Sequence, residues 1–135
     1  MNLVERLIAV DKKEFEKIET KEIPSKRLSE LFGEPAKVKL RAVEGDMFAP
    51  LSASGLNRDG KVDYSRAYDT NAKIAAAGMV DPDLKDEALL KHLGVVTPAE
   101  AAKKIFKGEI NNIASEVAKV SGFEDEEETD NEIKN

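Results

Sequence analysis

The sequence contains no cysteine and only one histidine, and each shortage excludes a kind of chemistry. Without cysteine the chain has no disulfides and no thiolate metal sites, and it fits a reducing compartment. His92 has no partner at the spacing that a His-Glu-x-x-His zinc site or a histidine-based triad needs. It falls at the end of an expected short helix, where a polar residue favours the helix dipole, so a structural role is predicted. The sequence therefore predicts no metal and no cofactor.

Long apolar runs are also missing. No stretch approaches the roughly 18 apolar residues that a membrane-spanning helix needs, so none is expected. The first ten residues carry Glu5 and Arg6 inside an apolar stretch and no positive segment before it, unlike a signal peptide. Phosphate-binding GxGxxG and GKS/GKT motifs are absent, and so is a nucleophile elbow. These absences predict a cytoplasmic protein that is not an enzyme and has no catalytic residues.

The charge of the chain is concentrated at one end. The formal net charge is −6, and residues 124–135 account for all of it with seven acids and one lysine. The remaining 123 residues hold 20 acids and 20 bases, so they offer no electrostatic footprint for nucleic acid or for an anionic membrane. We expect a disordered acidic tail at residues 124–135, after a single domain of residues 1–123. We interpret the tail as a solubility device, with docking of a basic partner as the alternative.

The N-terminal part alternates between helical and extended patterns. Residues 2–9 predict a short amphipathic helix, because their apolar residues gather near one helical face. The mostly charged stretch 11–22 is interpreted as a solvated segment that becomes extended before Pro24, since a residue before proline disfavours the helical region. Leu28–Phe32 fits either one helical turn or a short strand, ended by the glycine and proline that follow.

Lys37–Val43 is the clearest strand, because polar and apolar residues alternate there. Its partner strand is either Glu19–Ile23 or the Lys61–Val62 neighbourhood, which follows a sequence suited to a tight turn. Residues 44–60 are rich in Gly, Ser, Asp and Pro, and they predict a loop that admits a helical turn near Asp46.

The sequence after residue 63 predicts about four helices. The first is stopped by Asp81-Pro82-Asp83, and its expected apolar face consists of Tyr64, Tyr68, Ala72, Ala75 and Met79. The third begins at a strong start signal, Thr97-Pro98-Ala99-Glu100, and the fourth begins near Glu109. The fold class is therefore α+β, with a small antiparallel sheet around Lys37–Val43 and a predominantly helical C-terminal half.

Two segments resemble functional motifs without satisfying them. Gly55–Arg66 has the spacing of a calcium loop, but it lacks the acid at the first position and the glutamate at the last. Residues 86–107 have the outline of a helix-turn-helix, which makes a nucleic-acid-associated regulator the alternative function. The start of the second helix carries Glu100 where a DNA reader carries basic side chains, so helix packing is the simpler interpretation.

An apolar group within residues 44–60, Met47, Phe48 and Leu51, is either a docking patch or a cover for the core. A protein without chemistry of its own works by binding another protein, and apolar helix faces are the simplest means. The predicted partner-binding residues are Met47, Phe48, Leu51, Tyr68, Met79, Ile105, Phe106 and Phe123.

The order and spacing of these elements resemble the XkdN-like tail assembly chaperones of long-tailed phages and prophages. The resembling segments cover most of residues 18–123: Ser25–Leu28, Lys37–Val43, Tyr68–Ala77, Val80–Leu84, Leu93–Val95, Lys107–Ile110 and Ser121–Phe123. The resemblance implies a chaperone that acts in the bacterial host cytoplasm. It would bind the tape measure protein, keep it soluble until the tail tube polymerises, and be absent from the finished virion. It further implies contact with the major tail tube protein through a frameshift-extended form, where one is made.

Overall fold

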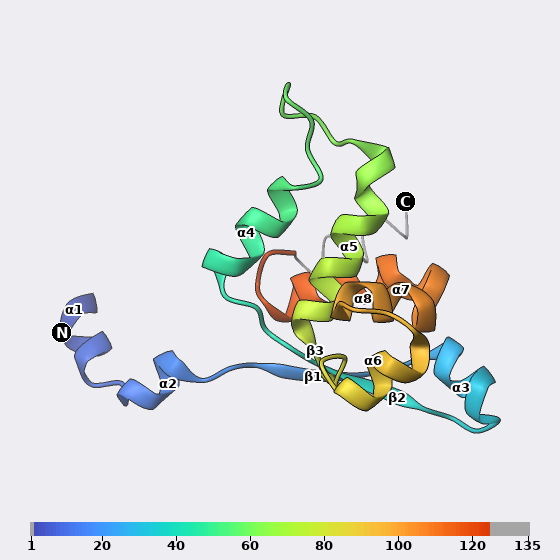
Figure 1. The fold of residues 1–135 in the computed structure, drawn as a ribbon. Coiled ribbons are helices and arrows are strands. Elements are labelled where there is room, and N and C mark those ends of the chain that lie inside the picture. Colours follow the sequence, from blue (N-terminus) through green and yellow to red (C-terminus); the bar gives the residue numbers. More distant parts are fainter. Residues whose placement is uncertain (1, 125–135) are drawn as a thin grey trace, which may run out of the picture.

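The structure is a computed structural model that describes residues 2–124, and Figure 1 shows the order of its elements. The strands are β1 (Thr20–Pro24), β2 (Lys37–Arg41) and β3 (Met79–Asp81). The helices are α1 (Leu3–Ile8), α2 (Lys12–Glu16), α3 (Lys26–Phe32), α4 (Gly45–Ala53), α5 (Tyr64–Gly78), α6 (Glu87–Leu93), α7 (Pro98–Phe106), the short 3₁₀ helix η1 (Lys107–Glu109) and α8 (Ile110–Val120). Of the predicted acidic tail, only Glu124 falls within the described residues.

A three-stranded antiparallel sheet forms around the alternating segment, in the order β1-β2-β3. Val38 and Leu40 are buried on one face of β2, while the polar residues between them face outward. β1 pairs with the whole length of β2, so the first of the two predicted partner strands is correct. The other candidate contains Val62, which forms only an isolated bridge with Leu56. Together with the helices, this sheet confirms the predicted α+β class.

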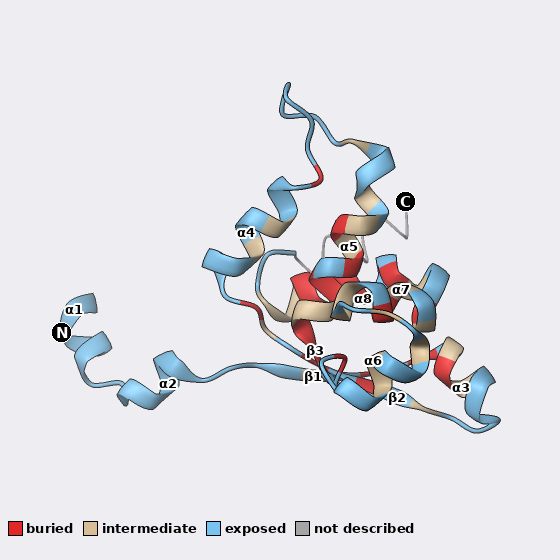
Figure 2. Cartoon of the chain, in the orientation of Figure 1, coloured by how far each residue is buried: buried red, intermediate tan, exposed pale blue. Residues whose placement is uncertain are grey.

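The core lies where the sheet meets α5, α7 and α8, and Figure 2 shows the buried residues gathered there. The largest fully buried side chain belongs to Phe106 at the end of α7. α5 and α8 approach each other closely at Gly78, whose backbone lies against Val117. The predicted helices after residue 63 are therefore present, and their apolar faces form this core.

A buried polar contact holds α3 against the C-terminal half of the chain. Ser25 is fully buried, and its hydroxyl donates a hydrogen bond of 2.7 Å to the carboxylate of Glu109. The backbone N–H groups of Lys26 and Arg27 donate to the same carboxylate at 3.0 Å each. An acid at this position suits the first turn of a helix, where N–H groups lack intrahelical partners. Lys26–Phe32 therefore form a helix with Ser25 as its N-cap, which settles the ambiguity between a helical turn and a strand.

Three sequence expectations for the middle of the chain need correction. Residues 44–60 contain the nine-residue helix α4 and not mainly a loop, because Phe48 and Leu51 pack against the core. Met79 belongs to β3 and not to the face of α5, because the chain leaves α5 to pair with β2. Tyr64 is 88% exposed, so it lies outside the buried face to which the pattern assigned it.

Residues 11–22 were expected to be a solvated segment that becomes extended before Pro24. The segment is largely exposed and becomes extended in β1, and it also contains a short helix that the sequence did not predict. Residues 12–16 form α2, whose first turn is capped by the side chain of Asp11 accepting from the backbone of Lys13 at 2.9 Å. The predicted helix within residues 2–9 is present as α1, capped by Asn2. Figure 1 shows both short helices lying away from the body of the molecule.

Candidate functional site

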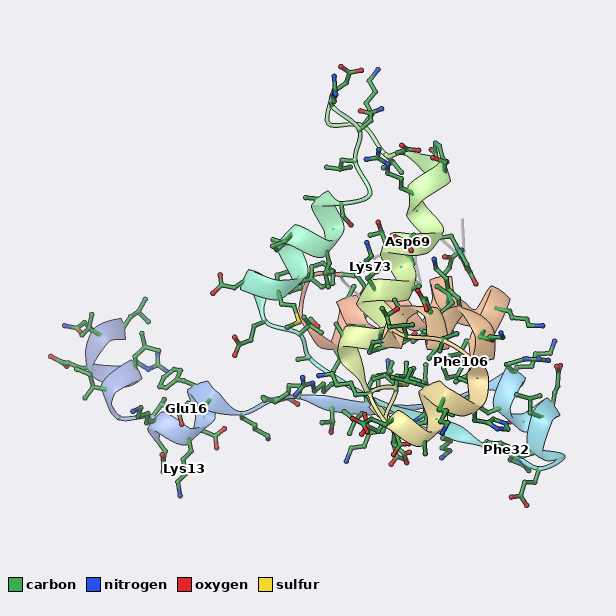
Figure 3. All side chains as sticks on the ribbon, viewed as in Figure 1. Lys13, Glu16, Phe32, Asp69, Lys73 and Phe106 are labelled. Carbon is green, nitrogen blue, oxygen red and sulfur yellow. The ribbon has the colours of Figure 1, made fainter. Side chains whose placement is uncertain are left out.

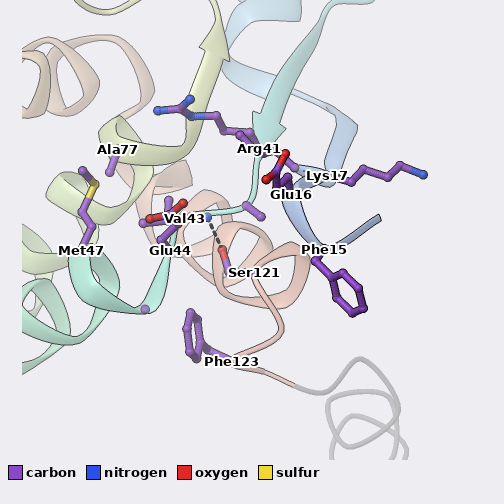
Figure 4. Close-up of a pocket in the computed structure, with 13 residues that line it drawn as sticks. Phe15, Glu16, Lys17, Arg41, Val43, Glu44, Met47, Ala77, Ser121 and Phe123 are labelled. Carbon is purple, nitrogen blue, oxygen red and sulfur yellow. Dashed lines mark hydrogen bonds between the residues drawn. The ribbon is translucent and has the colours of Figure 1, made fainter. Parts of the chain in front are cut away.

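A groove of about 620 Å³ lies between the end of β2, α4, the segment after α8 and the residues just before β1. We refer to this cavity as the groove. Its lining includes Met47 of α4, Phe123 beyond α8 and Phe15 of α2, which are labelled in Figure 4. Its apolar lining is completed by residues from three different parts of the chain, Ile18, Ala42 with Val43, and Ala77. The groove is thus a surface of mixed apolar and polar character, assembled from segments far apart in the sequence.

The charged residues that line the groove are balanced. Glu16 and Glu44 contribute two carboxylates, and Lys17 and Arg41 contribute two positive charges. Such a set orients a partner without attracting one sign of charge over the other.

Backbone donors at the floor of the groove already have partners. The N–H of Ala42 donates to the carbonyl of Glu19 at 2.8 Å. The N–H of Val43 donates to the hydroxyl of Ser121, also at 2.8 Å, and this hydroxyl in turn donates to Val117. These two positions therefore have no N–H group left for a partner's backbone.

One wall of the groove is fixed by an aromatic stack. The rings of Phe48 and Phe123 lie 4.5 Å apart between centroids and are close to parallel, with an interplanar angle of 18°. Aromatic pairs of this kind contribute roughly 0.5–1.5 kcal/mol beyond the burial of their area. Phe48 also packs against the core, while Phe123 stays 52% exposed. The stack therefore anchors Phe123 at the groove while leaving much of its ring accessible.

The chain before β1 continues this apolar surface away from the body, and we refer to residues 2–18 as the arm. Every residue of the arm is exposed, as the pale blue colour of this segment shows in Figure 2. Its large apolar side chains are uncovered: Leu3, Val4, Leu7, Ile8, Val10, Phe15 and Ile18. Monomeric proteins seldom leave such a contiguous apolar set exposed unless it binds something. The arm and the groove together form the candidate binding surface.

The predicted partner-binding residues fall into three groups. Met47 and Phe123 line the groove and are each 52% exposed, and Phe48 is stacked behind them. Tyr68 is partly exposed on α5, where its hydroxyl donates to the carbonyl of Lys107 at 3.0 Å. The others support the core: Leu51 and Ile105 are half-buried against it, while Met79 and Phe106 are 8% and 1% exposed. A partner that binds the folded body cannot reach the last two.

The arm residues were not among the predicted contacts. Leu3, Leu7 and Ile8 had been assigned to one helical face, and Phe15 and Ile18 are the apolar residues of a mostly charged stretch. The signal that could have identified the arm as a contact surface is the amphipathic pattern of residues 2–9, followed by two apolar residues in a mostly charged stretch. Only the structure places Phe15 and Ile18 at the groove with Met47 and Phe123.

A cluster of charges joins α5 to α7 outside the groove. The ammonium of Lys103 lies 2.6 Å from one carboxylate oxygen of Asp69, and that of Lys73 lies 3.1 Å from the other. The hydrogen bonds from Lys103 and then Lys73 hold the pKa of Asp69 below its ordinary value of 3.8, against a smaller opposing effect of burial. Figure 3 shows Asp69 and Lys73 on the same helix. This cluster ties two helices together and has the character of a structural contact.

Packing against the core accounts for the helix-turn-helix outline of residues 86–107. Ala101, Ala102 and Phe106 of α7 are buried in the core. Glu100 in the first turn of α7 accepts a hydrogen bond from the backbone of Val96 at 3.0 Å. The start of this helix therefore presents an acid that is already engaged, and the geometry gives no support to a DNA-reading role.

Metal and membrane sites find no support in the part of the chain that the structure describes. Residues 2–124 contain no group of three or more His, Cys, Asp or Glu side chains that could hold a metal ion. Among the helices of the same residues, none combines the length and apolar character that crossing a bilayer requires. The chief feature of the described residues is an uncovered apolar surface on a small α+β body, the kind of surface through which proteins bind other proteins.

Comparison with known proteins assigns the family. Residues 4–134 match the family described as phage XkdN-like tail assembly chaperone protein. The chain therefore belongs to the XkdN-like tail assembly chaperones, a non-enzymatic family that assists the assembly of phage tails. Its fold is similar to that in the crystal structure of the protein YqbN, with a TM-score of 0.56 and 21% identity over 80% of this chain and 90% of that one. No curated protein matches the sequence.

Proposed function

We propose that this chaperone binds the tape measure protein and keeps it soluble in the host cytoplasm until the tail tube polymerises around it. The observation that supports this function is the row of exposed apolar side chains on the arm, beside a groove that Met47 and Phe123 help to line, in a member of the tail assembly chaperone family. A long helical polypeptide exposes apolar stripes before its tube closes around it. Covering those stripes reversibly requires apolar surface and no chemistry.

Release follows from competition. The arriving tube subunits outcompete the chaperone for the same apolar stripes, so the chaperone leaves and is absent from the finished virion. A frameshift-extended form, where the gene makes one, recruits the tube protein to this complex.

Coexpression with the tape measure protein tests the proposal. The full chain should raise the soluble fraction of the tape measure protein and co-purify with it. The paired substitutions Leu7→Ser and Phe15→Ser in the arm should reduce both effects strongly, because both side chains are exposed and support no core.

A matched control uses apolar residues that are equally exposed on another element. Leu31 and Phe32 of α3 are 53% and 62% exposed and do not line the groove. Their replacement by serine should leave co-purification unchanged. If the unmodified chain neither co-purifies with the tape measure protein nor changes its solubility, the proposal is wrong.

A further inference from the structure

We propose that the outer edge of β1 binds an extended segment of another polypeptide as a fourth, antiparallel strand, with a lysine or arginine of that segment opposite Glu22. Within the residues that the structure describes, the sheet order β1-β2-β3 leaves β1 with a neighbouring strand on one side only. This surface is separate from the arm and from the groove, because no residue of β1 lines the groove. The inference therefore goes beyond the proposed function and does not depend on it.

The register of the sheet identifies the backbone groups that point outward from β1. The N–H of Ser25 donates to the carbonyl of Ala36 at 2.9 Å, so Ser25 is a position bonded toward the strand beside it. In an antiparallel pair such positions alternate along each strand. It follows that the backbone groups of three residues point away from β2, namely those of Thr20, Glu22 and Pro24.

This edge can form most of the backbone hydrogen bonds of a complete strand. All three residues are exposed, and no other described strand lies beside them. Thr20 and Glu22 each offer one N–H and one C=O, whereas Pro24 lacks an N–H and offers only its C=O. An added strand can therefore form five hydrogen bonds here, one fewer than at an edge without proline. Main-chain bonds of this kind supply the affinity when a peptide extends a sheet.

The charges on the outer face of the sheet define the chemistry of the added strand. Lys39 of β2 lies opposite Asp81 of β3 on one side and opposite Glu22 of β1 on the other. The row therefore alternates between negative and positive charge, and it ends at the open edge with the carboxylate of Glu22. Between directly opposite residues of antiparallel strands, opposite charges are stabilising and like charges are destabilising. A lysine or arginine in the added strand continues the alternation.

The inner face of the same edge favours apolar neighbours. Ile23 is buried there, and the ammonium of Lys21 donates to the carboxylate of Glu116 at 2.6 Å. The charge of Lys21 thus already has a partner in the fold. Because side chains alternate between the two faces of a sheet, the added strand should place apolar residues toward the helices and polar or basic residues toward solvent.

The β1 strand of a second copy of the chain fits this edge poorly. Antiparallel pairing centred on Glu22 would bring the two Glu22 side chains directly opposite each other, with like charges. It would also place each Thr20 opposite a Pro24, and the two missing N–H groups would remove two of the six possible hydrogen bonds. Charges and proline commonly protect sheet edges from self-pairing. The edge is therefore complementary to a different chain that carries a basic residue.

Two synthetic peptides test the inference with the full-length protein. Both have about nine residues that alternate threonine and valine, and the central residue is lysine in one and glutamate in the other. Chemical shifts of the backbone amides, measured by NMR at about 0.05 M salt, should show the lysine peptide binding about three- to tenfold more tightly, as expected for one cross-strand charge pair. When this peptide is present at about ten times its Kd, hydrogen exchange of the Thr20 and Glu22 amides should slow about tenfold.

Charge variants assign the preference to Glu22. Glu22→Lys should reverse it, so that the glutamate peptide binds more tightly, and the fold should persist because this side chain is exposed. Glu30→Lys is the matched control, since Glu30 is an exposed acid on α3 and lies outside the sheet. This control and the arm variant with Leu7→Ser and Phe15→Ser should both keep the preference for lysine.

Methylated peptides test the strand pairing itself. In an added strand, alternate N–H groups face β1 and the others face solvent. Methyl groups on the peptide nitrogens that face β1 should abolish binding. Methyl groups on the alternate nitrogens should leave most of the affinity, because those N–H groups donate nothing to the protein.

Several results would overturn the inference. Amides of Thr20 and Glu22 that are as protected from exchange in the free protein as that of Lys21 would show that the edge is already covered. Protection that rises with protein concentration would make a second copy the occupant. Failure of both peptides to bind, equal affinity for the two, a preference for lysine that survives Glu22→Lys, or equal effects of the two methylation patterns would also exclude the pairing. Co-purification with the tape measure protein is a separate measurement, so the proposed function can stand when this inference fails.

Discussion

Replacing Gly78 by alanine probes the closest approach between α5 and α8. A Cβ atom at this position would lie 2.7 Å from both γ-carbons of Val117 and 3.2 Å from the carbonyl oxygen of Arg41. Carbon atoms pack best at about 3.5–4.0 Å, so α8 would have to move by roughly 1 Å, or Val117 would have to leave its rotamer. Val117 is fully buried and cannot move without disturbing the core.

The magnitude follows from two opposing effects. Overpacking of this kind costs about 1–3 kcal/mol. Removing a glycine from a helix returns at most ~1 kcal/mol, and less here because Gly78 is the last residue of α5. We therefore expect Gly78→Ala to lower the free energy of unfolding by about 1–2 kcal/mol, or several degrees in Tm for a chain of this size.

A double-mutant cycle identifies the clash. Val117→Ala alone should cost roughly 2–3 kcal/mol, because it deletes two buried methyl groups and leaves a cavity. In the Gly78→Ala, Val117→Ala double variant the new methyl group occupies part of that cavity. The double variant should then be more stable than the sum of the single effects by about 1–3 kcal/mol.

Urea unfolding followed by circular dichroism measures all four proteins of the cycle. Gly108→Ala is the matched control, since an added Cβ there meets nothing within 4 Å and the backbone does not have a positive φ. A Gly78→Ala variant as stable as the unmodified protein would refute the close approach. An additive cycle would show that Val117 is not the residue that resists the methyl group.

Three further predictions concern other contacts. Glu109→Ala should lower the free energy of unfolding in urea by about 2–3 kcal/mol, because it leaves the buried Ser25 hydroxyl without its charged acceptor. Asp69→Asn should destabilise the protein by less than about 1 kcal/mol at neutral pH, since the side chain is 46% exposed. The pKa of Asp69 is lowered in the folded protein. The stability that the Asp69 carboxylate contributes is therefore complete above the ordinary pKa of 3.8 and is lost as pH falls through the lowered pKa of the folded protein. The melting temperatures of the variant and the unmodified protein should converge in acid. The paired substitutions Leu7→Ser and Phe15→Ser should destabilise the protein by no more than about 0.5 kcal/mol, because neither side chain is buried. Scanning calorimetry measures the melting temperature, and a large drop would show that the arm packs on the body.

Periodicity in the sequence was sufficient for the central strand and for the helices after residue 63. It was insufficient where long-range packing decides the local structure. The helix α4 forms although it begins with Gly45 and contains Pro50, because Phe48 stacks on Phe123, far along the chain. β3 spans three residues, too few for any pattern, and it exists because β2 offers an edge to pair with.

Only part of the candidate site could be predicted from the sequence, because packing also decides which apolar side chains stay exposed. Met47 and Phe123 were expected to bind a partner, and both line the groove. Met79 and Phe106 were expected to do the same, but an apolar pattern does not distinguish a residue that faces the core from one that faces outward. Phe15 stands in a highly charged stretch, so only the folded arrangement reveals its place beside Met47.

The contact between Ser25 and Glu109 also constrains the order in which the nascent protein can mature. The two residues are 84 positions apart, and Lys21 reaches even further, to Glu116. Contacts of such large sequence separation form late and slow the search for the native topology. Residues 2–18, the arm, are exposed throughout and take part in neither of these contacts, so the late steps that close the body of the molecule leave the conformation of this segment unaffected.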